Sequence, residues 1–153
     1  MVQAIYKFAS FDPKSLHDDI ALLQIQGKLD LNNKTSQSIG LPEEHYCPYP
    51  GDQVLVSGWG TQEHNPHLAD FLKHANFTVR ANPKCNQKIT RDQFCAGGNG
   101  VSLEYGDNGD PAVENMKLVG IGLWRQSLYA SSQEPSIFVC VGNYTDWIRR
   151  IIG

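Results

Sequence analysis

Short apolar runs, separated by turn residues, extend along most of the chain. The runs are rich in valine, isoleucine and leucine, and in one of them apolar and polar positions alternate. They predict β-strands at residues 20–25, 53–57, 76–80, 117–123 and 136–141. Clusters of glycine, proline and aspartate, such as Tyr49-Pro50-Gly51-Asp52, close these runs as turns do. Strands at this spacing predict an all-β antiparallel barrel or sandwich.

Two segments have a helical pattern instead. The first, His67–His74, predicts one short turn. The second begins at Asn143, which is placed to cap a helix, and it ends with two arginines that suit a helix C-terminus. The predicted apolar face of this helix consists of Tyr144, Trp147, Ile148 and Ile151.

Length and charge narrow the class of protein. At 153 residues the chain is long enough for one domain with its own core. A net charge of −3 gives no basis for binding nucleic acid or an anionic membrane. The apolar runs are too short to span a bilayer. Residues 2–8 lack the apolar core of a signal peptide, so we expect any export signal to lie upstream.

The four cysteines indicate an oxidising compartment. They are widely spaced and none forms a C-x-x-C pair, so zinc and thioredoxin chemistry are not predicted. An even count fits two disulfides in a secreted protein. Three glycosylation sequons, at Asn33, Asn76 and Asn143, agree with secretion. We predict no cofactor and no metal site, because Pro66 spoils helical ligand spacing in the segment 64–67.

Five segments, in the right order along the chain, resemble the trypsin-like serine proteases of the chymotrypsin fold. They correspond to the strand that begins with the triad aspartate, the turn that follows the first strand of the second barrel, a segment before the nucleophile, the nucleophile loop, and the last strand with its helix. The segments are Asp19-Ile20-Ala21-Leu22-Leu23, Val56-Ser57-Gly58-Trp59-Gly60, Gln93-Phe94-Cys95-Ala96-Gly97, Gly106-Asp107-Asn108-Gly109-Asp110-Pro111 and Val141-Gly142-Asn143-Tyr144-Thr145-Asp146-Trp147-Ile148.

This resemblance implies a chymotrypsin-like double Greek-key β-barrel. Residues 43–153 would form the complete second barrel with its C-terminal helix. Residues 1–42 would be remnant strands of the first barrel and the interdomain linker.

The same resemblance implies that catalysis is lost. Asn108 occupies the nucleophile position, and an amide nitrogen is a poor nucleophile. Asp19 matches the carboxylate that orients the base, but the motif that carries the general-base histidine is absent. His17 cannot replace it, since nearby strand residues face opposite sides, and we expect His17 on the surface.

The oxyanion hole is expected to be incomplete. Gly106 and Asn108 match its backbone donors. In the family this hole forms when the processed N-terminal amine pairs with the aspartate at Asp107, and that terminus is missing here. Asp110 also replaces a glycine of the family pattern. We therefore expect an unformed, zymogen-like hole.

The substrate pocket departs from the family pattern at several positions. Ser102 matches the base of the pocket, and Tyr105 is expected across the cleft. The segment Leu123-Trp124-Arg125 replaces Ser-Trp-Gly, which places a long cationic side chain where glycine leaves space. Ser136 replaces a wall glycine, and Glu104 replaces a bridging cysteine. These changes predict a blocked or collapsed pocket.

The family resemblance also implies the two disulfides. Cys85 and Cys95 match the bridge that closes the loop before the nucleophile segment. Cys47 and Cys140 lie near a second family bridge, which joins the interdomain linker to the final strand.

Together these features predict a secreted, non-catalytic protease homologue that binds a protein as a decoy or as a regulator of proteolytic cascades. Inactivated family members occur in arthropods, parasitic mites among them, which implies a partner in host defence or a protease cascade. One alternative is a fragment of a trypsin-like endopeptidase whose missing N-terminal half supplies the histidine. The other is a product without function, whose unpaired strand edges would aggregate.

Overall fold

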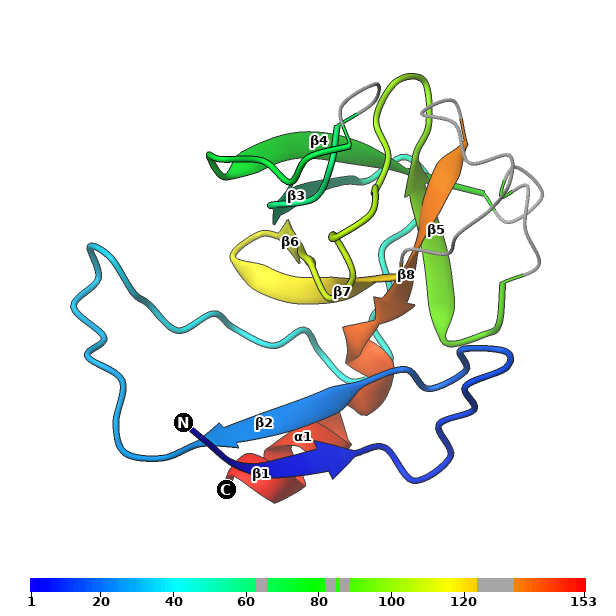
Figure 1. Cartoon of the computed structure of the whole chain (residues 1–153). Coiled ribbons are helices and arrows are strands. Elements are labelled where there is room, and N and C mark those ends of the chain that lie inside the picture. Colours follow the sequence, from blue (N-terminus) through cyan, green and yellow to red (C-terminus); the bar gives the residue numbers. More distant parts are fainter. Residues whose placement is uncertain (63–65, 82–84, 86–88, 124–133) are drawn as a thin grey trace.

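A six-stranded antiparallel barrel forms the larger part of the molecule (Figure 1). The computed structural model describes residues 1–62, 66–81, 85, 89–123 and 134–153, so Trp124, Arg125 and His64 lie outside the described residues. The strands follow one another around the barrel in the order β3-β4-β5-β8-β7-β6. Their bounds are β3 Gln53–Gly58, β4 Lys73–Arg80, β5 Gln93–Gly97, β6 Pro111–Glu114, β7 Lys117–Leu123 and β8 Pro135–Cys140.

The N-terminal region forms a separate two-stranded sheet. Strand β1 (Val2–Lys7) pairs antiparallel with β2 (Ala21–Ile25). The chain ends in a 3₁₀ helix, η2 (Val141–Tyr144), followed by α1 (Thr145–Ile152). In Figure 1 the two-stranded sheet and α1 lie on the same side of the barrel. The predicted all-β antiparallel barrel with its C-terminal helix is confirmed.

The barrel interior is a close-packed aromatic and aliphatic core. Alternate residues of β3 point inward, so Val54 and Val56 are buried while Leu55 is exposed. The ring of Phe138 is fully buried and stacks on Phe94, with the ring centroids 5.2 Å apart. This packing makes the barrel a rigid support for the loops at its ends.

A second core joins the barrel to the N-terminal sheet through the C-terminal helices. The ring of Phe8 meets Tyr144 edge-on at 4.9 Å and Trp147 at 5.2 Å between centroids. Ile20 and Ile148 are buried in the same cluster. Full burial of an aromatic or aliphatic side chain contributes about 1.5–3 kcal/mol, so this cluster fixes the sheet against the barrel.

Several predicted elements differ from the observed ones. The segment His67–His74 contains no helical turn, because β4 already begins at Lys73. Asn143 does not cap α1: it lies within η2, and the N-cap position belongs to Tyr144, without a side-chain cap hydrogen bond. The chain turns immediately after β8, so Val141 is the first residue of η2 and not part of the last strand.

Both predicted disulfides are present. Cys47 and Cys140 have their Cα atoms 5.6 Å apart, and Cys85 and Cys95 have theirs 6.0 Å apart. The first joins the segment before β3 to the end of β8, and the second joins a loop to β5.

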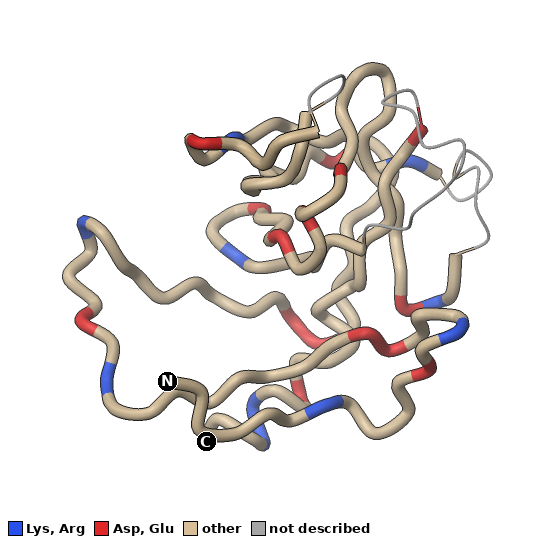
Figure 2. The backbone as a smooth tube through the Cα atoms, in the orientation of Figure 1, with Lys and Arg blue, Asp and Glu red and all other residues tan. Residues whose placement is uncertain are grey.

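The charged residues show no single basic face. Figure 2 shows lysines and arginines scattered over the N-terminal sheet, the loops and the barrel. In the described part of the chain, no helix has the length and apolar character needed to cross a membrane.

Candidate functional site

The segment that resembles the nucleophile loop connects β5 to β6 and is held by the carboxylate of Asp107. One carboxylate oxygen accepts a hydrogen bond from the backbone N–H of Gly60 at 2.7 Å, and the other accepts one from Glu104 N–H at 2.9 Å. Gly60 follows β3, so Asp107 ties the loop to the neighbouring strand end. Gly106 has φ of 99°, a conformation that favours glycine.

Asn108 is exposed, and the two residues that follow it are anchored by backbone hydrogen bonds. The N–H of Gly109 donates to the carbonyl of Gly122 at 2.9 Å, and Gly122 N–H donates to the carbonyl of Asp110 at 2.8 Å. These bonds fix the loop against β7. The resemblance places Asn108 at the nucleophile position, and its side chain is an amide, which is a poor nucleophile compared with a serine hydroxyl.

The loop contains a second carboxylate that faces the first. The Oδ2 atom of Asp110 is buried and accepts no hydrogen bond from the described residues. Burial, then the negative charge of Asp107 and a hydrogen bond with it, raise the pKa of Asp110 to about 7. Family resemblance alone marked Asp110 as a replaced glycine and did not predict this pairing.

A cavity of about 300 Å³ lies beside this pair. Its walls come from the loop, from the ends of β3 and β4, and from the segment that carries Ser102. Lys73 and His74 of β4 line it together with Asp107 and Asp110. The cavity thus combines two facing carboxylates with cationic and titratable groups on the opposite strand.

Of the residues predicted for the substrate pocket, Ser102 and Ser136 lie on neighbouring segments that are joined by a hydrogen bond. The hydroxyl of Ser136 accepts a hydrogen bond from the N–H of Leu103 at 2.7 Å, and the hydroxyl of Ser102 donates to Glu104 at 2.9 Å. Leu123 is buried, whereas Tyr105 is 63% exposed. Because Trp124 and Arg125 lie outside the described residues, the blocked pocket stays a prediction, as does the unformed oxyanion hole.

Asp19, which matches the orienting carboxylate, is partly buried just before β2. Burial raises the pKa of Asp19.

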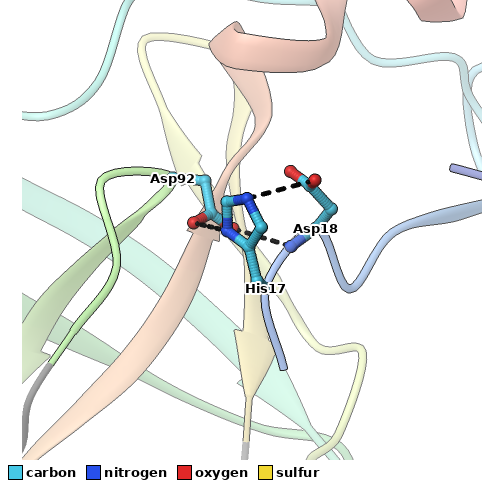
Figure 3. Close-up of side chains that lie close together, drawn as sticks. All are labelled: His17, Asp18 and Asp92. Atoms are coloured by element: carbon cyan, nitrogen blue, oxygen red, sulfur yellow. Dashed lines mark hydrogen bonds and ion pairs between the residues drawn. The ribbon is translucent and has the colours of Figure 1, made fainter. Parts of the chain in front are cut away.

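His17 engages two other carboxylates (Figure 3). Its Nδ1 lies 2.6 Å from Asp92 Oδ1, and its Nε2 lies 3.2 Å from Asp18 Oδ2. Each ring nitrogen of His17 thus lies within hydrogen-bond distance of a different carboxylate. His17 is partly exposed, as a surface position implies, but both of its ring nitrogens are occupied, and it lies in a turn and not on a strand. It is therefore not available as a base for Asp19.

The hydroxyl of Tyr144 completes this network from the barrel side. It donates to Asp18 Oδ1 at 2.6 Å and lies 3.2 Å from Asp92 Oδ2, and all three residues are buried. Sequence reasoning missed the network because its members lie far apart along the chain. The local sequence offered little signal of it: Asp18 precedes the predicted strand 20–25, and Asp92 precedes β5, which was not predicted as a strand.

The group of His17, Asp18 and Asp92 also has the atom types of a metal site. Among the described residues, these three place one ligand atom each within 4.8 Å of one another. The ring nitrogens and carboxylate oxygens already make hydrogen bonds, so the network is complete without an ion. We assign it a structural role, joining the turn before β2 to the start of β5.

Comparison with known proteins places this fold and loop in one family. The family model described as Trypsin matches residues 1–148. Trypsin Blo t 3 of Blomia tropicalis is 31% identical over 150 residues, covering 91% of this chain and 56% of the relative. Kallikrein-8 of Rattus norvegicus is 31% identical over 155 residues, covering 95% of this chain and 57% of the relative. The chain thus spans under three fifths of the length of these relatives.

Two solved structures are similar over nearly the whole chain. The scabies mite inactivated protease paralogue S-D1 has a TM-score of 0.89 and 34% identity, covering 99% of this chain and 68% of that one. The paralogue S-I1 has a TM-score of 0.82 and 31% identity, covering 99% and 67%. The family match, the barrel order and the disulfides agree, and the chain therefore belongs to the trypsin family of serine proteases.

Proposed function

We propose that this protein is a catalytically inactive, secreted member of the trypsin family that binds another protein, as a decoy or as a regulator of a proteolytic cascade. The observation that carries the proposal is Asn108 at the nucleophile position of a loop that is otherwise anchored at both sides. Similarity to two inactivated protease paralogues of the scabies mite supports the inactive form. The four cysteines, all in disulfides, support an extracellular location.

An exposed apolar surface beside the loop supports a binding role. Trp59, Leu68 and Tyr105 are each more than half exposed. Backbone hydrogen bonds join their segments: Ala69 N–H donates to the carbonyl of Trp59, and Thr61 N–H donates to that of Tyr105. Large aromatic side chains held on fixed backbone are typical of the residues that dominate protein–protein binding energy. We define Trp59, Leu68 and Tyr105 as the loop-side surface.

The proposal includes the organisation of the chain. Residues 1–42 act as the remnant of a first barrel with the linker, and residues 43–153 act as the second barrel. It also includes glycans on Asn33, Asn76 and Asn143, whose side chains belong to exposed residues.

The second candidate is a fragment of an endopeptidase whose upstream part supplies the histidine. The observation that favours it is the length of the chain relative to its relatives, 56–57% of those compared. Asn108 opposes it, because a supplied base still lacks a hydroxyl to activate.

Hydrolysis of a broad peptide library by the purified protein and by Asn108→Ser tests inactivity, with an active trypsin as positive control. We expect no turnover from either protein, because neither the amide of Asn108 nor a serine hydroxyl there finds an activating histidine among the described residues. Turnover by the native chain would contradict the proposal. Turnover by Asn108→Ser alone, after addition of a first-barrel segment with the histidine, would favour the fragment hypothesis.

Binding is tested separately with variants of the loop-side surface. Proteins captured from extracellular host fluid by the native chain are compared with those captured by Trp59→Ala and Tyr105→Ala. Tyr49→Ala is the matched control, because Tyr49 is a tyrosine of similar exposure, 69% against 63%, at the turn before β3. We expect the first two variants to lose a partner that the control retains. Equal capture by all four proteins would exclude this surface as the binding site.

A further inference from the structure

The carboxylates of Asp107 and Asp110, in the loop that resembles the nucleophile loop, both point to the space beside Gly58. A Cβ atom added to Gly58 would collide with Asp110 Oδ2 and would lie 2.6 Å from Asp107 Oδ1. The two oxygens therefore converge on the space that the glycine of β3 leaves open. Two ionised carboxylates in such proximity repel each other, and the repulsion is stronger in a partly buried site.

The hydrogen bonds distinguish the two groups. Both oxygens of Asp107 accept backbone N–H donors, from Gly60 and Glu104, as an ionised carboxylate does. Oδ2 of Asp110 is buried, and the described residues offer it no donor. A buried, ionised oxygen without a donor is costly, whereas a protonated oxygen turns the same position into a donor.

We propose that Asp110 carries a proton on Oδ2 and uses it to donate a hydrogen bond to the carboxylate of Asp107. Loss of this proton releases the loop formed by residues 104–110, so that this loop is a pH-sensitive switch. The proton balance is simple, because ionisation transfers one proton to solvent and leaves two carboxylates facing each other. The loop carries Tyr105, so the switch also sets the loop-side surface; this last step rests on the proposed function.

The charges around the pair are few. Lys73 and His74 of β4 line the same cavity from the opposite strand, and Glu104 lines it from the loop itself. Burial, the charge of Asp107 and the hydrogen bond with it raise the pKa of Asp110 to about 7, which places the transition near neutral pH. The neutral pair predominates below that value, and the loop is released as the pH rises through it.

Carboxyl ¹³C resonances and backbone amide exchange test the switch without any partner. We expect the Asp110 carboxyl to titrate near pH 7. Protection of the Gly60 and Glu104 amides from exchange should fall at least tenfold between pH 6 and 8, after correction for the intrinsic rise of the exchange rate with pH. A tenfold change corresponds to a shift of one unit in the pKa of Asp110. In Asp110→Asn the amide group donates to Asp107 at every pH, so protection of both amides should stay constant over this range.

Two variants exclude the other groups of the cavity. Glu104→Gln and His74→Gln should leave the transition at the same pH. A midpoint that moves with His74, an Asp110 carboxyl that titrates below pH 5, or protection independent of pH in the native chain would overturn the switch. The native titration decides the matter even where a variant fails to fold. If the Asp110 carboxyl resonance titrates near pH 7 but the protein binds no partner at any pH, the binding function alone is refuted. If the protein binds a partner but Asp110 does not titrate in this range, the switch alone is refuted.

Discussion

The hydroxyl of Tyr144 offers the sharpest test of how the N-terminal region is attached to the barrel. Tyr144→Phe removes the donor to Asp18 Oδ1 and the contact with Asp92 Oδ2. It keeps the ring and therefore the edge contact with Phe8. The substitution thus isolates the polar part of this connection from the apolar part.

The expected cost follows from the burial of the groups involved. Tyr144, Asp18 and Asp92 are 2%, 7% and 3% exposed, so water cannot replace the lost donor. A hydrogen bond to a charged group contributes about 1.5–3 kcal/mol. We expect the free energy of unfolding at pH 7 to fall by about 2 kcal/mol. Burial, followed by the hydrogen bond to Asp18 and the neighbouring carboxylates, raises the pKa of Tyr144 far above its ordinary value, so the hydroxyl remains a donor at neutral pH.

The cost should also depend on pH. Burial raises the pKa of Asp92, but interactions with Thr90, with the N–H of Asp18 and with His17 outweigh it, and the net pKa lies below the ordinary value. A carboxyl group whose pKa is lowered by folding stabilises the protein above its pKa in the unfolded chain, about 4. This stabilisation is lost as the pH falls through its pKa in the folded protein. The difference between native chain and Tyr144→Phe should therefore shrink below pH 4.

Urea unfolding with intact disulfides, followed by tryptophan fluorescence and circular dichroism at pH 7 and pH 3, measures both effects. Tyr6→Phe is the matched control, because its hydroxyl hydrogen-bonds Gln24 on the exposed sheet and its loss should stay within about 0.5 kcal/mol. A cost below about 0.5 kcal/mol for Tyr144→Phe at pH 7, or an equal cost at both pH values, would refute the reasoning.

Three further changes probe the fold and the surface. Phe138→Ala should lower the free energy of unfolding by about 3–5 kcal/mol in the same assay, since this fully buried ring stacks in the barrel core, and a loss under 1 kcal/mol would contradict that packing. Gly142→Ala should abolish soluble protein, because the added Cβ would collide with the backbone of Tyr46. Gly51→Ala has open space around the added Cβ and only a strained φ of 103°, so it should lower the free energy of unfolding by about 1 kcal/mol. Asn33→Gln, expressed in a secretory host, should lose one glycan by mass spectrometry, and an unchanged mass would show that Asn33 carries none.

The predicted strands succeeded where one face of the sheet is buried. Phe77 and Val79 are buried between less buried polar neighbours in β4, and this alternation is visible in the sequence. All five residues of β5 are buried, so no alternation marks it. Strand β1 fails for the opposite reason, because five of its six residues are exposed and the sixth only partly buried. Periodicity reports contrast between two faces, and neither strand has that contrast.

The site divides in a similar way. The sequence predicts the roles of Asn108 and Asp107 from a local loop pattern, and in the structure Asp107 holds that loop through Gly60 and Glu104. The contact between His17 and Asp92 joins residues 75 positions apart, and no local pattern encodes it. The pairing of Asp107 with Asp110 lies within one loop, yet it depends on the conformation of that loop and on the space at Gly58. Motifs therefore identified the loop but not its internal electrostatics.

The cluster around Phe8 imposes an order on folding. Phe8 belongs to the N-terminal part of the chain, and its ring partners, Tyr144 and Trp147, belong to the last eleven residues. The disulfide between Cys47 and Cys140 spans 93 positions and likewise needs the end of the chain. At a synthesis rate of about 5–20 residues per second, the N-terminal strands are therefore made several seconds before Tyr144 and Trp147, the residues against which Phe8 packs. The core of these strands therefore forms only after residues 144–148 have been made, and removal of α1 would leave the first strands without the surface on which they pack.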